Sequence, residues 1–526
     1  MNKGLKSYTK HLNLNVGNVN IYTNLYSGDA NFLFTLPLLT TVGYAPINIG
    51  LIFSKFRAAL GEFGIGMRLN YNISIQSSGN KLRVTNSDFT VDEYEYSEEN
   101  NEYRCKETDY VITRSGAFLM EDRQGNVIKL YENNKYPDEI RYSTGEIIYF
   151  NYNEETNDLI EIHNNNGDYL YFNKDIDSGM VETISWKKNE EELAHIYLIY
   201  ENGYLIGAEI SYSGTNYKQY SFEYGDSKYR ISDDISKDKV EVDFYGLAAI
   251  KLTKQKKNST YYNEVFIDRN GNRTIVRENG KETTYVFDMD GLLMFVKDDR
   301  NNIISYHYDK QTKKLLAAND ASLVDGSSNL YDGQGNFSNI DESDEFYISL
   351  FGNNIKFCSQ NQQIEVTGEF KKGDLVSLIM WVKQTGNSNI GIELSNYNET
   401  CHYVLEKRSL EEYFPVVCGI KLENNTEKLK VNINITEPII IGKIELVKRA
   451  YGVYYSYQDW NLVRVDKNGC IEEYLYNEKN EMIENQLVTS KVVAYERNEK
   501  GYIVKSVNEY ASAVNKGYDD KNKLSS

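Results

Sequence analysis

The sequence predicts an all-β protein, built as a long antiparallel strip of β-hairpins that is interrupted by a jelly-roll-like β-sandwich. The composition is the first reason, because Tyr occurs 45 times beside 20 Phe and 3 Trp, and Tyr favours strands with a half-buried face. The second is that 36 Gly accompany only 5 Pro, which favours long ladders joined by glycine turns. The third is a short segment that returns at a fixed spacing.

This repeat is clearest near the end of the chain, where "YLYNEKNEMI", "YERNEKGYI" and "KGYDDKNKL" begin about 21 residues apart. The same pattern occurs earlier in "YVFDMDGLL" and "YHYDKQTKKLL". Each copy reads aromatic, any residue, aromatic, Asp or Asn, followed by polar residues and two apolar ones. The residues assigned to the repeat are Tyr285, Phe287, Asp288, Tyr306, Tyr308, Asp309, Tyr474, Tyr476, Asn477, Tyr495, Tyr518 and Asp519.

The repeat has a simple physical interpretation as a β-hairpin. Aromatic residues at i and i+2 lie on one face of a strand. The Asp or Asn supports the turn, because its side chain bonds the backbone two residues further on. A later Gly or Asn supplies the positive φ that the turn requires. Such a hairpin cannot bury its aromatic face alone, so successive hairpins are expected to stack into one continuous strip.

These motifs resemble the YD repeats of RHS proteins, and the resemblance is clearest in "YVFD" and "YHYD". The N-terminal region is similar to the segment that opens many RHS assemblies, which carries a G-x-F/G-x-G-W-x-x-x-Y cluster. Met67 stands where that family usually has Trp. The residues that match the cluster are Gly61, Phe63, Gly64, Gly66 and Tyr71.

The resemblance divides the chain into four parts. Residues 1–90 form an N-terminal opening β segment and residues 91–318 a YD-repeat sheet. Residues 319–449 lose the repeat and form an inserted block, after which the repeats resume over 450–526. The last copy stops in mid-unit, which predicts a truncated or split RHS protein.

The inserted block contains eight or so strand-like runs at roughly ten-residue spacing, a pattern typical of a β-sandwich. It resembles the carbohydrate-binding-like modules embedded in some Gram-positive RHS proteins, above all in "KKGDLVSLIMWVKQTG". Alternation in this run assigns one wholly apolar face to the core. The residues of that face are Val376, Leu378, Met380 and Val382.

Trp381 lies on the other, less uniformly apolar face of the same run. It is therefore a candidate to line a sugar-binding surface, together with Tyr397, Tyr403 or Tyr413. The alternative interpretation is that Trp381 packs under a loop as ordinary core.

Charge and cysteine usage exclude several classes of function. With 77 acidic and 58 basic residues the formal charge is −19, which repels phosphate backbones and excludes nucleic acid as a partner. The 5 Cys are odd in number and contain no CxxC pair, so neither a disulfide framework nor a metal site is predicted. The sequence shows no signal peptide and no apolar stretch of the roughly 18 residues that a membrane helix needs.

Recognisable catalytic motifs are missing from the sequence. The 5 His form no HExxH motif, and no nucleotide-binding glycine loop precedes a helix. The sequence therefore predicts a protein that is not an enzyme and that carries no cofactor or metal, although a glycoside hydrolase with two converging carboxylates remains a third hypothesis.

The resemblance supplies the leading functional hypothesis. RHS proteins coil their repeat strip into a hollow shell around a toxic C-terminal segment. The chain is therefore expected to be a non-catalytic scaffold that encloses or presents a toxin, an effector or another partner, such as further RHS repeats. The alternative is a cell-surface adhesion or glycan-binding protein that binds polysaccharide through 319–449. The resemblance also implies secretion or association with a bacterial cell surface.

Overall fold

The computed structural model describes most of the chain. The described ranges are 10–36, 47–55, 59–132, 134–153, 155–156, 158–212, 217–256, 262–270, 273–288, 290–300, 302–309, 312–323, 337–339, 355–384, 389–396, 400–405, 414–467, 470–487, 491–499, 502–507 and 513–516. Within these ranges the secondary structure consists of strands and turns without a helix, which confirms the predicted fold class.

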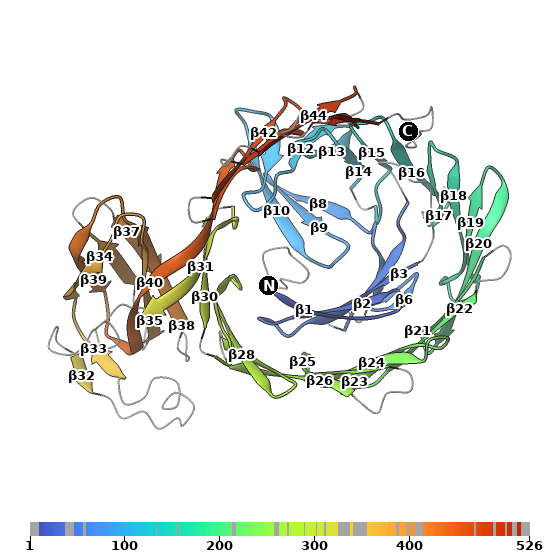
Figure 1. Ribbon diagram of the computed structural model, residues 1–526. Helices are drawn as coiled ribbons and strands as arrows, with labels where there is room; N and C mark the ends of the chain where they lie inside the picture. Colours follow the sequence, from blue (N-terminus) through green and yellow to red (C-terminus); the bar gives the residue numbers. More distant parts are fainter. Residues whose placement is uncertain are drawn as a thin grey trace.

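One long antiparallel ladder, which we call the wall, makes up most of the molecule. The wall curls into a ring, and its last strands cross over strands near its beginning (Figure 1). Its first part contains β8 (Ser74–Ser78), β9 (Lys81–Thr85), β10 (Val91–Ser97), β11 (Glu102–Arg104), β12 (Val111–Ser115), β13 (Ala117–Glu121), β14 (Val127–Leu130), β15 (Glu139–Arg141), β16 (Ile147–Tyr152), β17 (Leu159–Asn164), β18 (Asp168–Lys174), β19 (Val181–Lys188), β20 (Glu191–Glu201), β21 (Tyr204–Tyr212), β22 (Tyr217–Tyr224), β23 (Lys228–Asp233), β24 (Asp238–Tyr245), β25 (Ala248–Gln255), β26 (Tyr262–Asn270), β27 (Arg273–Glu278), β28 (Lys281–Phe287), β29 (Leu293–Lys297), β30 (Ile303–Tyr308) and β31 (Leu315–Leu323). Its last part contains β40 (Ile439–Gln458), β41 (Asn461–Lys467), β42 (Cys470–Tyr476), β43 (Met482–Leu487), β44 (Lys491–Arg497), β45 (Ile503–Val507) and β46 (Ala513–Asn515).

The turns of the wall rest on Asp or Asn side chains. The carboxylate of Asp288 accepts hydrogen bonds from the backbone N–H groups of Asp290 and Leu292, both at 2.8 Å. The side-chain oxygen of Asn477 accepts equivalent bonds from Lys479 at 3.0 Å and Glu481 at 2.9 Å. Where the chain reverses, these side-chain hydrogen bonds take the place of the backbone hydrogen bonds between strands, as expected for Asp and Asn in turns.

A register shift directly before these turns accounts for the curvature of the wall. Such a bulge bends the strand and increases its twist. Because the shift recurs at equivalent positions of several hairpins along the wall, its small bends add to one another and contribute to the ring. The shifted positions that precede an Asp or Asn turn are Asn151/Tyr152, Asn173/Lys174, Val286/Phe287, His307/Tyr308, Leu475/Tyr476 and Glu496/Arg497.

The N-terminal residues form a small sheet that lies inside the ring (Figure 1). Five of its strands are ordered β1-β2-β3-β4-β7, and β5 pairs with β6. Its strands are β1 (His11–Val16), β2 (Val19–Asn24), β3 (Ala30–Thr35), β4 (Gly50–Ser54), β5 (Leu60–Gly61), β6 (Gly64–Ile65) and β7 (Met67–Leu69). The N-terminal sheet and the inward face of the wall share one hydrophobic core.

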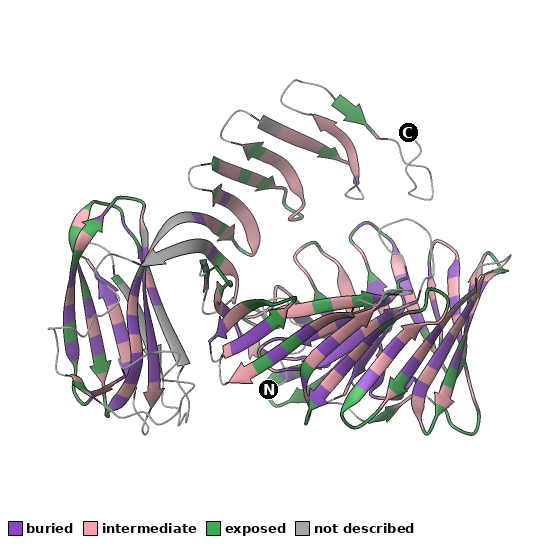
Figure 2. Ribbon diagram, turned by 60° about the horizontal axis from the view of Figure 1, so that its bottom comes forward, coloured by how far each residue is buried: buried purple, intermediate pink, exposed green. Residues whose placement is uncertain are grey.

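The remaining strands form a sandwich beside the ring. Its strands are β32 (Phe337–Asn339), β33 (Lys356–Cys358), β34 (Gln362–Phe370), β35 (Leu375–Gln384), β36 (Ile390–Ser395), β37 (Thr400–Leu405), β38 (Phe414–Lys421) and β39 (Thr426–Ile435). One sheet is ordered β34-β39-β36-β37, and the other contains β38, β35 and the first half of β40. A separate core lies between them and contains the predicted apolar face of β35. Figure 2 shows buried residues, in purple, along the strands of the sandwich.

Sandwich and wall are joined through shared strands rather than through a linker. β40 is 20 residues long, pairing with β35 in the sandwich and with β31 and β41 in the wall. The predicted boundaries at 319 and 449 therefore fall inside β31 and β40.

Candidate functional site

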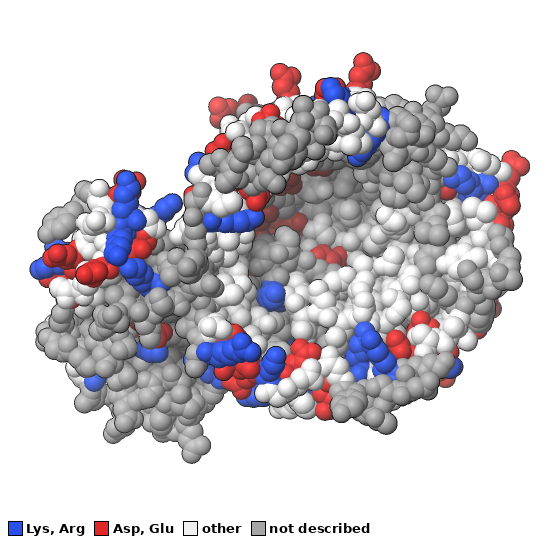
Figure 3. Space-filling view, viewed as in Figure 1, with Lys and Arg blue, Asp and Glu red and all other residues white. Residues whose placement is uncertain are grey.

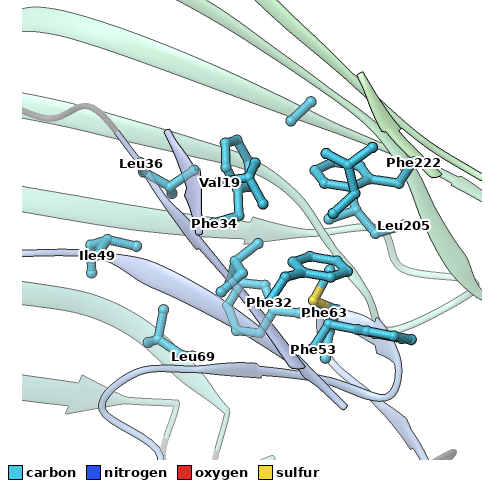
Figure 4. Packing of buried hydrophobic residues seen from close by; sticks show 14 of the residues in the cluster. Val19, Phe32, Phe34, Leu36, Ile49, Phe53, Phe63, Leu69, Leu205 and Phe222 are labelled. Atoms are coloured by element: carbon cyan, nitrogen blue, oxygen red, sulfur yellow. The ribbon is translucent and has the colours of Figure 1, made fainter. Parts of the chain in front are cut away.

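The inward face of the wall carries a row of aromatic side chains that binds the N-terminal sheet. On β22, Tyr220 and Phe222 lie on the same face because they are two residues apart, and this face contacts the N-terminal sheet. Phe32 stacks on Phe222 with 5.5 Å between ring centroids and an interplanar angle of 7°. Phe34 contacts Tyr220 at 4.9 Å. Figure 4 shows Phe32, Phe34 and Phe222 between the two layers, so the inward face of the wall already holds a polypeptide sheet.

The glycines of the N-terminal cluster allow an equally close contact between backbones. Ile65 donates its N–H to the carbonyl of Gly203 at 2.8 Å. A Cβ atom at Gly64 would lie 2.8 Å from that same carbonyl oxygen, and one at Gly66 would lie 2.9 Å from the carbonyl of Ser54. Both glycines also have positive φ, +94° and +74°. Only glycine fits at position 64 without moving the sheet away from the wall, and only glycine fits at position 66 without moving that segment away from β4.

Glu62, within the same cluster, is fixed by charged and polar side chains of the wall. Its carboxylate accepts a hydrogen bond from the Tyr136 hydroxyl and forms an ion pair with Lys174 at 2.8 Å. Lys174 also pairs with Asp158 at 2.5 Å. Burial and the neighbouring Glu62 raise the pKa of Tyr136 well above its usual value, so the phenol remains a donor.

The wall contacts itself where its last hairpins cross its first ones, and we call this contact the seam. Arg123, in the turn between β13 and β14, donates from its guanidinium to the carbonyl of Asp459. The side-chain amide of Asn480 donates to the carbonyl of Arg123 at 2.5 Å. The hydroxyl of Tyr502 donates to Glu146. Hairpin turns from the first and the last part of the wall therefore meet edge to edge.

A cavity of about 680 Å³ opens at the seam, and we call it the seam pocket. Three cationic side chains line it together with three aromatic ones, two carboxylates and smaller groups. The lining residues are Arg104, Arg123, Asp309, Thr312, Lys314, Leu316, Tyr455, Ser456, Tyr457, Asp459 and Trp460. A second cavity of about 370 Å³ shares Thr312, Lys314 and Trp460 with it.

Lys314 is held in the seam pocket by aromatic rings. Its ammonium nitrogen lies 4.0 Å from the ring centroid of Trp460 and 4.6 Å from that of Tyr457, which are cation–π distances. Burial and the like charge of Arg123 lower the pKa of Lys314 to about 8.

Trp460 occupies an unfavourable backbone position. It is the second residue of the two-residue turn between β40 and β41, with φ +82°, after Asp459 at +48°. Two other hairpins have the same turn with Asn202-Gly203 and Asn279-Gly280. A bulky residue in this left-handed region is a backbone outlier.

The structure places Trp381 away from solvent. Its side chain is 5% exposed and packs edge-to-face against Phe295 of β29, with 6.2 Å between ring centroids. A ring this buried offers no face for stacking a sugar. Tyr397 and Tyr413 lie outside the described residues, as does the side chain of Tyr403, so the glycan surface stays a prediction.

The residues assigned to the repeat lie at strand ends and turns of the wall. Tyr476 donates its hydroxyl to the carbonyl of Leu462 at 2.8 Å, which ties one hairpin to the preceding one. Asp309 accepts from the N–H of Thr312 at 2.7 Å. Tyr518 and Asp519 lie outside the described residues.

Sequence reasoning missed the seam residues Arg123, Lys314 and Trp460. A signal was present for Trp460, because "QDWN" has Trp where comparable turns have Gly. The described ranges contain no cluster of three His, Cys, Asp or Glu side chains that would hold a metal. In those ranges we also find no helix long and apolar enough to span a membrane.

Comparisons with known proteins give only remote likenesses. No protein-family model matches the chain, and no curated protein matches it. The crystal structure of TcdB2-TccC3-Cdc42 is similar at 8% identity with a TM-score of 0.30, covering 95% of this chain and 25% of that one. TcdB2-TccC3 gives 9% identity and a TM-score of 0.26 over 98% of this chain and 30% of that one. The exo-β-1,3-galactanase of Phanerochaete chrysosporium gives 9% and 0.23, over 74% and 99%.

This chain thus spans about a quarter to a third of the length of the two TcdB2-TccC3 structures. At these TM-scores, membership of the RHS family stays a prediction.

Proposed function

We propose that this protein is a non-catalytic β-scaffold whose curled wall encloses or presents a polypeptide partner, such as an effector, a toxin or further repeats of the same kind. The observation that carries the proposal is the packing of the N-terminal sheet on the concave face of the wall. There Phe32 stacks on Phe222 and Phe34 contacts Tyr220. The wall thus binds a polypeptide sheet on its inside by stacking aromatic rings.

The shape of the wall supports the same proposal. Figure 3 shows that the ring is hollowed at its centre and that few charged side chains border the described part of the hollow. Contacts at the seam join residues 336 to 357 positions apart in the chain. These contacts keep the wall curled, and a curled wall shields what it contains. Such a role requires no catalytic step.

Site-specific photocrosslinking tests the proposal. The full chain is expressed together with the coding sequences that flank its own, with p-benzoylphenylalanine at Tyr306 or at Tyr197. Tyr306 lines the cavity beside Lys10 on the inner side. Tyr197 is 49% exposed and follows the buried Ile196 on β20, so it faces outward.

The expected result is that one polypeptide, identified by mass spectrometry, crosslinks from Tyr306 but not from Tyr197. That polypeptide should also resist protease in the complex and become sensitive when it is purified alone. A monomeric scaffold that crosslinks to no polypeptide from Tyr306 would overturn the proposal.

A further inference from the structure

We propose that the seam pocket is a binding site for a small organic molecule that carries a carboxylate or phosphate group. This inference goes beyond the scaffold function, because it assigns a ligand to the place where the wall meets itself. The volume of the seam pocket, about 680 Å³, lies within the range of pockets that bury small molecules. An inorganic ion alone would leave most of it unfilled.

The charge of the lining favours an anion. Arg104, Arg123 and Lys314 line the pocket against the two carboxylates of Asp309 and Asp459. Arg104 is paired with Glu102 at 2.5 Å, so Arg123 and Lys314 are the two cations that remain to bind an anion, in a chain whose formal charge is −19. Guanidinium and ammonium groups are the side chains that bind carboxylate and phosphate most strongly.

The opposing carboxylate of Asp309 is occupied by its own turn. One of its oxygens accepts hydrogen bonds from the N–H of Thr312 at 2.7 Å and from the Thr312 hydroxyl at 2.9 Å. Lys314 has its ammonium group against the rings of Tyr457 and Trp460 instead of a carboxylate. Arg123 lies close enough to lower the pKa of Lys314. An oxyanion between these two cations would relieve their repulsion.

The aromatic side chains favour a ligand with an organic body. Tyr455, Tyr457 and Trp460 line one pocket, and such rings pack against sugars, bases and other flat groups. The backbone of Trp460 supports a function for its ring, since the equivalent residue is Gly203 or Gly280 in two comparable turns and the flexible Glu190 in a third, whereas Trp is the bulkiest residue possible there. A strained backbone of this kind persists only where the surrounding structure maintains it. In spite of this strain the turn has Trp at this position, so an indole ring lines the pocket, whereas a glycine would leave no side chain there.

Calorimetric titration of the full chain with three sugars tests the proposal. The probes are glucuronate, which carries a carboxylate, glucose 6-phosphate, which carries a phosphate, and uncharged glucose as the control. The variants are Trp460→Gly, which removes the ring, and Lys314→Met, which removes the charge and keeps the apolar stem. Glu190→Gly is the matched control, because Glu190 has φ +72° in the corresponding position of the turn between β19 and β20.

We expect saturable binding of at least one anionic sugar and none of glucose, and the stronger of the two identifies the anionic group. Trp460→Gly and Lys314→Met should each weaken binding about tenfold or more, while Glu190→Gly leaves it unchanged. Both glycine variants should remain folded, because the relief of backbone strain offsets the higher conformational entropy of glycine in the unfolded chain.

Two results would overturn the proposal. One is the absence of saturable binding by either anionic sugar. The other is binding that persists undiminished in Trp460→Gly and Lys314→Met, which would place the ligand elsewhere. A destabilised Trp460→Gly variant of a chain that binds neither sugar would show that the indole only fastens the seam.

Discussion

The hydroxyl of Tyr502 donates a hydrogen bond to the carboxylate of Glu146, although the two residues are 356 positions apart in the chain. Glu146 is 2% exposed and Tyr502 6% exposed. Thr144 donates its hydroxyl to the other carboxylate oxygen of Glu146. The seam thus contains a buried carboxylate that accepts hydrogen bonds from the first part of the wall, through Thr144, and from its last part, through Tyr502.

Removing the Tyr502 hydroxyl should therefore loosen the seam. In Tyr502→Phe, a buried carboxylate loses the hydrogen bond from the Tyr502 hydroxyl, which costs about 1–3 kcal/mol. We expect faster amide hydrogen exchange in β45 and earlier protease cleavage near the seam. Tyr474→Phe is the control, because Tyr474 donates at 2.7 Å to Glu472 on its own strand. Equal exchange rates in β45 of the two variants would contradict a role for Tyr502 in closing the ring.

Asp288 predicts a pH dependence of stability. Burial raises the pKa of its carboxyl to about 6 from the ordinary 3.8. The folded state therefore holds this proton more tightly than the unfolded state, and its contribution to stability falls as pH rises between about 4 and 6. Asn keeps the acceptor oxygen that the turn uses and does not ionise. Asp288→Asn should therefore be more stable than the parent at pH 7, by the order of 1–2 kcal/mol, and equally stable near pH 4.

Asp298 provides the matched control, because it supports the same kind of turn from a more solvated position. It accepts from the N–H groups of Arg300 at 2.9 Å and Asn302 at 2.8 Å. The hydrogen bond from the Asn302 side chain is the main cause that lowers the pKa of Asp298. Its contribution is thus present at neutral pH and lost as pH falls, so Asp298→Asn should bring no gain at pH 7. Urea unfolding of both variants from pH 4 to pH 8 checks the two signs.

The fold class and the turn chemistry could be predicted from the sequence because both are local. Aromatic residues two apart, followed by Asp or Asn, specify a strand and its turn within about ten residues. That is why the pattern at Tyr285 and Tyr306 predicts a β-hairpin strip. The apolar face of β35 was predictable for the same reason, from simple alternation.

The seam and the ring could not be predicted, because they arise from accumulated geometry. Each bulge bends the wall only slightly, and the sequence does not state how many such bends bring Arg123 to Asp459. Core packing of Trp381 was foreseen as the alternative to a sugar-binding role, but its partner was hidden. Alternation placed it on the less apolar face of β35, and its partner Phe295 belongs to a distant strand of the wall.

The pair of Trp381 and Phe295 should couple the sandwich to the wall. Trp381→Ala removes a buried indole and should cost about 3–5 kcal/mol. Part of this cost belongs to the edge-to-face contact, which is worth about 0.5–1.5 kcal/mol beyond area burial. A double-mutant cycle with Phe295→Leu, measured by urea unfolding of the full chain, isolates that part. Strictly additive effects would show that the contact transmits no stability between the two units.

Gly64 and Gly145 separate two costs of replacing glycine. Their φ angles are nearly equal, +94° and +93°, so alanine meets the same backbone strain at both. Their surroundings differ, because a Cβ atom at Gly64 would lie 2.8 Å from the carbonyl oxygen of Gly203, whereas one at Gly145 meets nothing within 4 Å. Gly145→Ala should therefore lose only the strain energy, about 1–2 kcal/mol.

Gly64→Ala should lose more, because the added methyl group forces the N-terminal sheet away from β21. The hydrogen bond from Ile65 to the Gly203 carbonyl would lengthen, and the amide of Ile65 should exchange faster with solvent. Hydrogen exchange and urea unfolding of the two variants check this difference. If Gly64→Ala and Gly145→Ala lose equal stability and protect Ile65 equally, the close approach of the two backbones does not hold the sheet inside the ring. The larger loss at Gly64 is expected because backbone, unlike a flexible side chain, cannot move aside without breaking the ladder that contains it.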